Sequence, residues 1–213
     1  ITRQMESTRT SQLVGLSVPL TLHGQLILGS GSPRRKELLT VLGIPFSIRV
    51  ADSPETAPPG LTDIDTVSHV AKEKAMVLAP DLVKGEVLLT ADTEVWMDGI
   101  RYGKPKDASD AKAMLSRLCG RQHRVITALW ATDGSTWKHA EAVALVTLAD
   151  MGQDWIDYYV DRHMPLDKAG GYGAQEWIGH LGIANMDGTF DNVKGLPLPE
   201  VLTVLRPWLH TTD

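Results

Sequence analysis

The chain has 213 residues, of which 43% are hydrophobic and 22% charged, and its formal net charge is −5. This composition is typical of a globular protein with a sizeable core and excludes a largely disordered chain. The acidic balance, together with the lack of a stripe that alternates aromatic and basic residues, disfavours a nucleic-acid-binding protein. The single cysteine, Cys119, excludes an internal disulfide and fits a reducing compartment, so we expect a cytoplasmic protein.

The first 24 residues precede the first regular pattern. The apolar stretch 13–22 is interrupted by polar residues and proline, is too short to cross a bilayer, and lacks the long apolar core of a secretory signal. We therefore expect residues 1–24 to form a partly disordered N-terminal extension without membrane contact. Residues 25–213 are expected to form one domain.

Predicted strands and helices alternate along the rest of the chain. Apolar runs bounded by turn residues predict strands at 25–28, 46–50, 87–97, 100–102, 124–132 and 142–149. Helical spacing of apolar residues predicts helices from Pro33 to Gly43, at 63–78, after Asp107, at 153–160 and after Pro199. Asp-Gly pairs at 98–99, 133–134 and 187–188 predict hairpin-type turns, and 165–188 is rich in turn signals. These elements predict an α/β fold in which helices flank a mixed sheet.

A Gly/Ser turn at 29–32 leads into a helix whose first turn carries three cations at 34–36. A helix N-terminus favours acidic side chains, so this turn conflicts with the helix dipole unless an anion binds there. Loop N–H groups, serine hydroxyls and arginines could converge on a phosphate, while a solvated basic turn without a ligand is the alternative. The candidate anion-binding side chains are Ser30, Ser32, Arg34 and Arg35.

Two charged residues interrupt apolar patterns further along the chain. Lys74 lies on the apolar face of the helix predicted at 63–78, where it either snorkels to solvent or points at a buried acid or phosphate. Asp92 directly follows a buried-type strand and must be paired, hydrogen-bonded or metal-bound; a structural acid at a strand end is the alternative. Glu55, in a proline-rich loop, and Lys104, after the hairpin, could share its site. Such carboxylates suit a magnesium-type ion, and the whole set suits phosphoryl chemistry.

Six ordered segments resemble the Maf family of nucleotide pyrophosphatases and together span about residues 26–205. They are GSGSPRRKELL (29–39), AKEKA (71–75), ADT (91–93), GKP (103–105), DKAGGYGAQ (167–175) and VKGLPLP (193–199). The resemblance implies a fold like that of the inosine triphosphate pyrophosphatases, with a twisted mixed sheet and two lobes around a cleft. It also implies that water attacks the α-phosphate of a nucleoside triphosphate and pyrophosphate leaves, assisted by a divalent cation, Mg or Mn.

The resemblance further implies roles for individual residues. Asp92 matches the general base of the family and Glu55 a second acid near the metal, so both are expected metal ligands. Ser32, Arg35, Lys74 and Lys104 match phosphate-binding groups, and we assign both lysines to the catalytic set together with the two acids.

The base preference can also be predicted by resemblance. Arg34, Thr93 and Gln175 match positions that mark the branch acting on dTTP and UTP, and the Gln175 amide offers a donor and an acceptor to a uracil-type ring. We therefore expect pyrimidine triphosphates, including modified uridine nucleotides, as substrates. A homodimer is expected only by analogy with such families.

Four positions depart from the family pattern. Gly29 stands where the family commonly has Ala, and Thr90 where it commonly has Gly; both adjoin the expected cleft and could alter its width. Pro54 stands in the first loop where the family has an acidic pair, so Glu55 is the one acid left there to bind a metal. Gly103 replaces a residue that is bulkier or acidic in some members.

A second hypothesis belongs to a different class of protein. Because the family is associated with septum formation, the same pocket could serve a nucleotide-binding regulator of cell division without turnover. Retention of both Asp92 and Glu55 favours the enzyme, since a pure sensor needs no acid that activates water.

Overall fold

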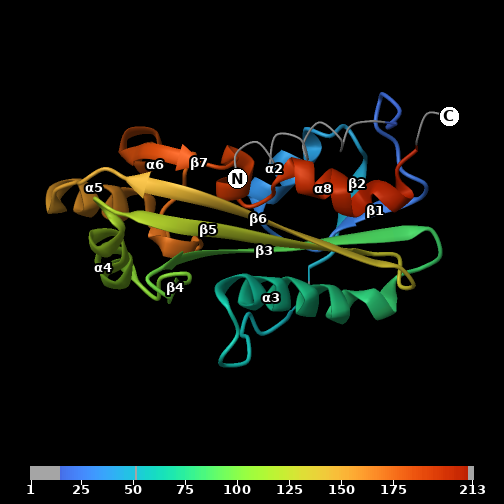
Figure 1. Ribbon diagram of the computed structural model, residues 1–213, viewed down its shortest axis with the longest axis horizontal. Coiled ribbons are helices and arrows are strands. Elements are labelled where there is room, and N and C mark those ends of the chain that lie inside the picture. Colours follow the sequence, from blue (N-terminus) through green and yellow to red (C-terminus); the bar gives the residue numbers. More distant parts are fainter. Residues whose placement is uncertain (1–14, 51, 211–213) are drawn as a thin grey trace.

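A mixed sheet forms the centre of the protein. The structure is a computed structural model that describes residues 15–50 and 52–210, and within these residues seven strands join one sheet in the order β2-β1-β3-β5-β6-β7, with β4 on β3 (Figure 1). The β2-β1-β3 pairs are parallel and the other pairs are antiparallel. The strands are β1 (Gln25–Leu28), β2 (Phe46–Ile48), β3 (Glu86–Met97), β4 (Ile100–Tyr102), β5 (Gln122–Thr132), β6 (Trp137–Leu148) and β7 (Ile183–Asp187).

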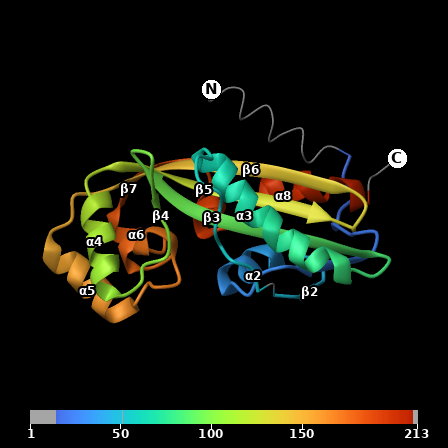
Figure 2. The same ribbon diagram turned by 90° about the horizontal axis from the view of Figure 1, so that it is seen from below.

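Helices cover both faces of this sheet. Helix α3 lies along one face, while α2 and α8 lie on the opposite face (Figure 1), and α4, α5 and α6 gather at one end (Figure 2). The α-helices are α2 (Pro33–Thr40), α3 (Asp63–Leu78), α4 (Ala108–Leu118), α5 (Gln153–His163), α6 (Trp177–Gly182), α7 (Phe190–Lys194) and α8 (Leu198–Leu205), and short 3₁₀ turns span Ala79–Asp81, Ala169–Gly171 and Arg206–Trp208. The predicted α/β class with flanking helices is confirmed.

Two large apolar clusters divide the molecule into two lobes that share the long central strands. One cluster packs α2 and α8 against β1 and the first half of β3, and it includes Leu39 and Leu202. The other packs α4 and α5 against the second half of β3 and includes Leu115 and Tyr159. Burial of apolar surface stabilises each lobe through its own cluster. A cleft can therefore remain open over the part of the sheet between the two clusters.

Local sequence signals set the boundaries of several elements. Thr62 caps α3 by accepting a hydrogen bond from the Asp65 N–H, and acidic residues occupy the first turn, as the helix dipole favours. The β3–β4 hairpin has a two-residue turn in which Asp98 and Gly99 both have positive φ, of 54° and 73°. That conformation is the one that Asp-Gly favours in tight hairpins.

The pairing of β3 leaves part of one edge open. On that edge β1 pairs with residues 86–89 and β4 with 95–97, whereas β5 covers the other edge from 88 to 96. Among the described strands, none pairs with residues 90–94 on the open edge. Side chains alternate along a strand, so Thr90, Asp92 and Glu94 face α3, and Thr93 faces the side of α2 and α7.

Several element boundaries differ from the sequence-based expectation. The strand predicted at 142–149 begins at Trp137, because residues 137–141 pair with β5 although Lys138, His139 and Glu141 give them a polar pattern. The strand predicted at 46–50 ends at Ile48. The helix predicted at 153–160 continues to His163.

The glycine-rich region 165–188 contains regular structure that the turn signals concealed. It includes α6 and β7, and the predicted hairpin turn at 187–188 is wrong: this pair ends β7 and leads into α7. Helices α6 and α7 have six and five residues, and β7 is a five-residue strand at the edge of the sheet, so none of the three is long enough to show a clear apolar period.

The N-terminal segment contacts the C-terminal end. Of the expected extension, residues 1–14 lie outside the described part of the chain. Leu16, Leu20 and Leu22 pack on the α2–α8 cluster, and Leu22 forms a β-bridge with Leu209. No helix in the described residues has the length and apolar character needed to traverse a lipid bilayer.

Two of the departures from the family pattern are in contact. Thr90 is fully buried, and its hydroxyl donates a hydrogen bond of 2.8 Å to the Ala71 carbonyl on α3. A Cβ added at Gly29 would lie 2.6 Å from the Thr90 methyl, Cγ2, and 3.1 Å from a methyl of Leu78 and a methyl of Leu88. The missing side chain at position 29 therefore makes room for the extra side chain at position 90.

Gly29→Ala is expected to lower the free energy of unfolding by about 1–3 kcal/mol, because it overpacks the contact with Thr90. The double variant Gly29→Ala/Thr90→Ser, which removes the methyl but keeps the hydroxyl, is expected to recover more than half of that loss. Urea unfolding of both variants and of Thr90→Ser measures the coupling. Equal losses from Gly29→Ala in the two backgrounds would show that the two residues do not compensate.

Candidate active site

A pocket of about 400 Å³ opens at the unpaired edge of β3, between the two lobes. Its wall comes from the turn after β1, the start of α2, the loop before α3, the middle of β3, the segment after β4, and the stretches that precede α6 and follow α7. The lining includes six basic and three acidic side chains, although the chain as a whole has a net charge of −5. The pocket is therefore a local excess of positive charge on an acidic protein.

A lysine between two carboxylates forms the floor of the pocket. The Lys74 ammonium lies 2.7 Å from Asp92 Oδ1 and 2.9 Å from Glu55 Oε1, and both Lys74 and Asp92 are only 8% exposed. Lys104 Nζ lies 2.5 Å from the other Glu55 oxygen, Oε2. Of the two sequence-based alternatives for Lys74, the inward orientation is the one found, because α3 packs directly beneath β3.

Glu55 is held in its ionised form by this arrangement. Burial raises the pKa of Glu55, but hydrogen bonds from Lys104 and Lys74 outweigh burial and bring the pKa down to about 2. The side chain is nevertheless 42% exposed, so it faces the pocket and the solvent. Glu55 is thus a carboxylate, and not a carboxylic acid, at any pH near neutrality.

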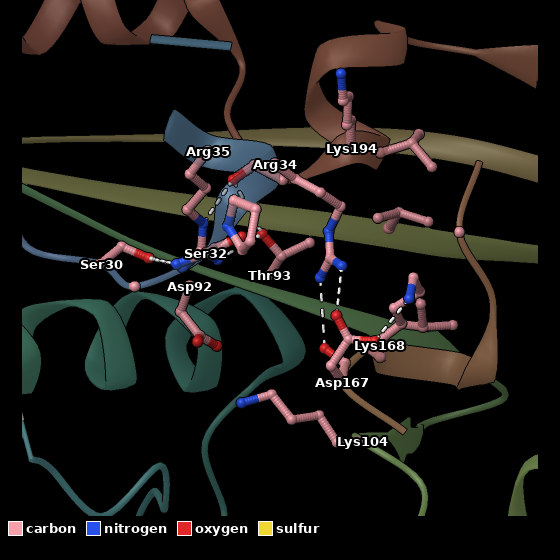
Figure 3. Close-up of a pocket in the computed structure, with 18 of the residues that line it drawn as sticks. Ser30, Ser32, Arg34, Arg35, Asp92, Thr93, Lys104, Asp167, Lys168 and Lys194 are labelled. Carbon is pink, nitrogen blue, oxygen red and sulfur yellow. Dashed lines mark hydrogen bonds and ion pairs between the residues drawn. The ribbon is translucent and has the colours of Figure 1, made fainter. Parts of the chain in front are cut away.

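The Arg35 side chain connects the start of α2 to three other segments that line the pocket. Its guanidinium donates hydrogen bonds to the Gly195 carbonyl at 2.9 Å, to Thr93 Oγ1 at 3.1 Å and to Ser30 Oγ at 3.3 Å (Figure 3). Thr93 in turn lies 3.0 Å from the Thr127 hydroxyl of β5. These bonds fix Arg35 beside the turn that follows β1.

The N-terminus of α2 has no side-chain cap. Ser32 occupies the N-cap position, but its hydroxyl accepts no hydrogen bond from the helix, and the first turn contains no acid. The partial positive charge at the start of α2 therefore faces the pocket without a capping side chain or a first-turn acid. This is the arrangement in which helix N-termini bind anions.

Arg34 spans the pocket towards the other lobe. Its Nη1 atom lies 2.7 Å from Asp167 Oδ2, and Nη2 donates to the Asp167 carbonyl at 3.4 Å (Figure 3). Burial raises the pKa of Asp167, but hydrogen bonds from Lys168 and Arg34 lower it to about 2. Arg34 and Asp167 are 133 positions apart in sequence, so this contact connects the two lobes directly.

All ten residues predicted for the site line this one pocket: Ser30, Ser32, Arg34, Arg35, Glu55, Lys74, Asp92, Thr93, Lys104 and Gln175. Lys36, the third cation of the predicted turn, is not among the lining residues and is exposed. Within the described residues, no hydrogen bond satisfies the Gln175 amide, which is half-buried at the pocket wall.

Three charged residues that line the pocket were not assigned a role from the sequence: Asp167, Lys168 and Lys194. Lys168 is 9% exposed and contacts Asp167 at 2.6 Å and Glu176 at 2.9 Å. The Lys194 ammonium lies 2.7 Å from the exposed Glu37. Lys168 and Lys194 lie in the segments 167–175 and 193–199, both of which resemble the family. A cation within each segment was the sequence signal that could have indicated a phosphate-binding role.

Metal binding would depend on few protein ligands. The described residues contain no group of three or more His, Cys, Asp or Glu side chains arranged around a common point. Asp92 and Glu55 nevertheless converge on one cation, the Lys74 ammonium, and magnesium is commonly held by one or two carboxylates together with substrate phosphates. The two carboxylates fit a divalent ion of that kind.

A mixed α/β fold with a cationic pocket and a buried lysine–carboxylate cluster defines a protein suited to a polyanionic ligand. The family model for Maf-like proteins matches residues 25–208, and the chain belongs to the Maf family. It is 41% identical over 183 residues to the dTTP/UTP pyrophosphatase of Phocaeicola vulgatus, and the aligned region covers 85% of this chain and 95% of that protein.

A second relative gives a similar result. The dTTP/UTP pyrophosphatase of Flavobacterium psychrophilum is 40% identical over 181 residues, which are 85% of this chain and 93% of that protein. Among solved structures, the Ham1 protein of Staphylococcus aureus aligns with 59% of this chain and 72% of its own, at a TM-score of 0.39 and 14% identity.

Lys74→Met is expected to lower the free energy of unfolding by about 3 kcal/mol at pH 7, because it leaves the Asp92 carboxylate buried without its cation. The contribution of Glu55 to this loss is present above a pH of about 4.5 and fades as the pH falls towards 2, since only the folded state holds the lowered pKa. Urea unfolding at several pH values measures both effects.

Lys72→Met is the matched control. Lys72 lies on the same helix but is exposed, and its ammonium contacts only the Trp130 ring, at 4.9 Å from the centroid, among the described residues. Its loss should cost less than about 1 kcal/mol. If the two lysine variants are equally stable, the Lys74 ion pairs do not hold the pocket floor together.

Proposed function

We propose that this protein is a nucleoside triphosphate pyrophosphatase that acts on dTTP, UTP and related modified pyrimidine nucleotides. The observation that carries the proposal is the single pocket in which an uncapped helix N-terminus and an excess of basic side chains face a carboxylate pair held by Lys74. The names of the relatives support the same substrates.

The phosphate chain would bind along the basic side of the pocket. A triphosphate carries several negative charges, and the six cations exceed the three carboxylates around the pocket. Ser30, Ser32 and Arg35 surround the N-terminus of α2, where phosphate oxygens would meet N–H groups, hydroxyls and a guanidinium. Lys74 and Lys104 would meet the same phosphates from the opposite side, so that cations flank the anhydride bond.

Asp92 is the group proposed to take a proton from the attacking water. Lys74 contacts its Oδ1 atom, which fixes the carboxylate while Oδ2 is left for a water molecule beside the α-phosphate. Attack at that phosphorus breaks the α–β anhydride bond and releases pyrophosphate. Lysine ammonium groups beside the leaving phosphates would stabilise the charge that develops there.

A divalent cation, Mg or Mn, would be held by Asp92 and Glu55 together with the substrate phosphates. When bound, such an ion polarises phosphoryl oxygens and neutralises the developing charge. The low pKa of Glu55, about 2, leaves this carboxylate available to a cation throughout the physiological pH range.

The base would lie towards the second lobe. Gln175 has an amide without a protein partner among the described residues, and Arg34 and Thr93 lie on the facing wall. An amide that both donates and accepts complements the N3–H and carbonyl oxygens of a uracil-type ring. This is the basis for proposing pyrimidine triphosphates over purine triphosphates.

Asp92→Asn is expected to lower kcat for pyrophosphate release by about 100- to 10,000-fold, the usual range for loss of a general base. The variant should still bind nucleotide, because the basic wall is intact. Pyrophosphate release from UTP with magnesium, and nucleotide binding by calorimetry, measure the two properties. Asp81→Asn, which alters an exposed acid outside the pocket, is the control and should match the wild type.

The products decide between the enzyme and its alternative. Release of orthophosphate in place of pyrophosphate would contradict the proposed cleavage site. Tight nucleotide binding by the wild type without any turnover would instead support a nucleotide-binding regulator. Activity of Asp92→Asn close to that of the wild type would exclude Asp92 as the base.

Gln175→Leu is expected to raise KM for dTTP and UTP by about tenfold, the cost of one lost hydrogen-bonding group, with a smaller change for CTP. Leucine keeps the approximate size of the side chain but neither donates nor accepts. A panel of ordinary and modified nucleoside triphosphates, assayed with both proteins, measures the preference. Equal increases for every base would show that Gln175 does not read the ring.

A further inference from the structure

A second acid lies beside Asp92 on the same face of β3. Glu94 is only 2% exposed, yet it does not line the pocket. Its Oε1 atom forms an ion pair with Arg101 Nη2 on β4, and its Oε2 atom accepts a hydrogen bond of 3.0 Å from the Trp96 indole N–H. A buried carboxylate with dedicated partners is costly to maintain, so its position calls for a reason.

The Arg101 side chain connects this buried acid to the pocket. The same Nη2 atom that pairs with Glu94 also donates a hydrogen bond of 3.3 Å to the main-chain carbonyl of Glu55. This one nitrogen therefore forms an ion pair with the Glu94 carboxylate and a hydrogen bond with the Glu55 carbonyl. A continuous connection therefore runs from Glu94 through Arg101 to Glu55.

The loop that carries Glu55 has little else to hold its backbone. Residues 52–61 contain three prolines and form neither helix nor strand. Within the described part of the chain, the Arg101 bond is the one hydrogen bond that links the main chain of this loop to another element. Among the residues that the structure describes, the other polar contacts of this loop with another element are those of the Glu55 carboxylate with Lys74 and Lys104.

We propose that Glu94 is a positioning residue that, through Arg101, fixes the 52–61 loop so that the Glu55 carboxylate meets Lys74 and Lys104. The inference rests on the proposed function, in which Glu55 helps to hold the cation and phosphates. Glu94 itself touches neither the substrate nor the pocket. It acts by keeping Arg101, which is 35% exposed, from turning out to solvent.

A stability role and a positioning role are two different explanations of Glu94. A buried carboxylate paired with an arginine that is 35% exposed adds little net stability, because loss of hydration offsets the attraction of the ion pair. The connection to the main chain of Glu55 is therefore the simpler explanation of its position.

Glu94→Leu separates the two explanations. A buried ion pair adds little net stability, and the partly exposed Arg101 can reach water once Glu94 is gone, so the melting temperature should change little. Released from Glu94, Arg101 would no longer hold the loop. We expect kcat to fall about 10- to 100-fold, as for other outer residues that orient functional ligands, with KM changed less than about threefold.

Three further variants sharpen the test. Glu94→Gln keeps an acceptor for Arg101 and should retain kcat within about threefold. Arg101→Leu added to Glu94→Leu should cause no further loss of kcat, because both changes break one connection. Arg121→Leu, which removes an exposed ion pair with Asp98 at the same hairpin, is the matched control and should leave kcat unchanged.

Hydrogen–deuterium exchange of residues 52–61 provides a readout that does not depend on turnover. Exchange should be at least about tenfold faster in Glu94→Leu than in the wild type and unchanged in Arg121→Leu, because local opening becomes easier. Unchanged exchange in Glu94→Leu would overturn the inference whatever the activity. Unchanged kcat in an active Glu94→Leu enzyme would also overturn it. If the wild type shows no turnover but exchange is still faster in Glu94→Leu, only the proposed function is refuted.

Discussion

The ammonium group of Lys74 lies between a carboxylate on the central sheet and a carboxylate on an irregular loop, and the geometry of the pocket depends on it. Asp92 and Lys74 are almost completely buried, and buried charges are tolerated only when they are paired. The pair therefore fixes how α3 sits beneath β3, while the second contact draws the Glu55 loop over the same point. Lys104 pairs with the same Glu55 carboxylate, so two acids and two lysines hold one another at the floor of the pocket. The proposed function needs the lysines to bind phosphates and the acids to bind a water molecule and a cation.

The sheet explains why this cluster faces open space. β3 pairs with β1 along its first third and with β4 along its last, and residues between them lack a strand on that edge. Alternation of side chains then presents Asp92 from one face and Thr93 from the other, beside the uncapped start of α2. Each lobe contributes cations to this gap, and the Arg34–Asp167 contact joins them. A site built in this way needs both lobes on one continuous set of strands.

Much of the fold could be predicted because its longest elements carry strong periodic patterns. The helix expected at 63–78 has those bounds in the structure, and the strand expected at 87–97 starts one residue earlier, at Glu86. Prediction failed where patterns were weak. Residues 137–141 are polar and become a strand only by pairing with β5, and the short elements α6, β7 and α7 lie in glycine-rich sequence. In these segments long-range pairing outweighs local propensity.

The sequence by itself determined the types of residue at the site, the family, and the conflict that each charged residue created within its local pattern. Only the tertiary structure decided that Lys74 points inward, that Lys168 and Lys194 join the pocket, and that Glu94 reaches Glu55 through Arg101. It also placed the Thr90 methyl where a side chain at position 29 would meet it. The physical reason is that local propensity and periodicity depend on neighbours along the chain, whereas ion pairs and close packing depend on distances between segments that folding brings together.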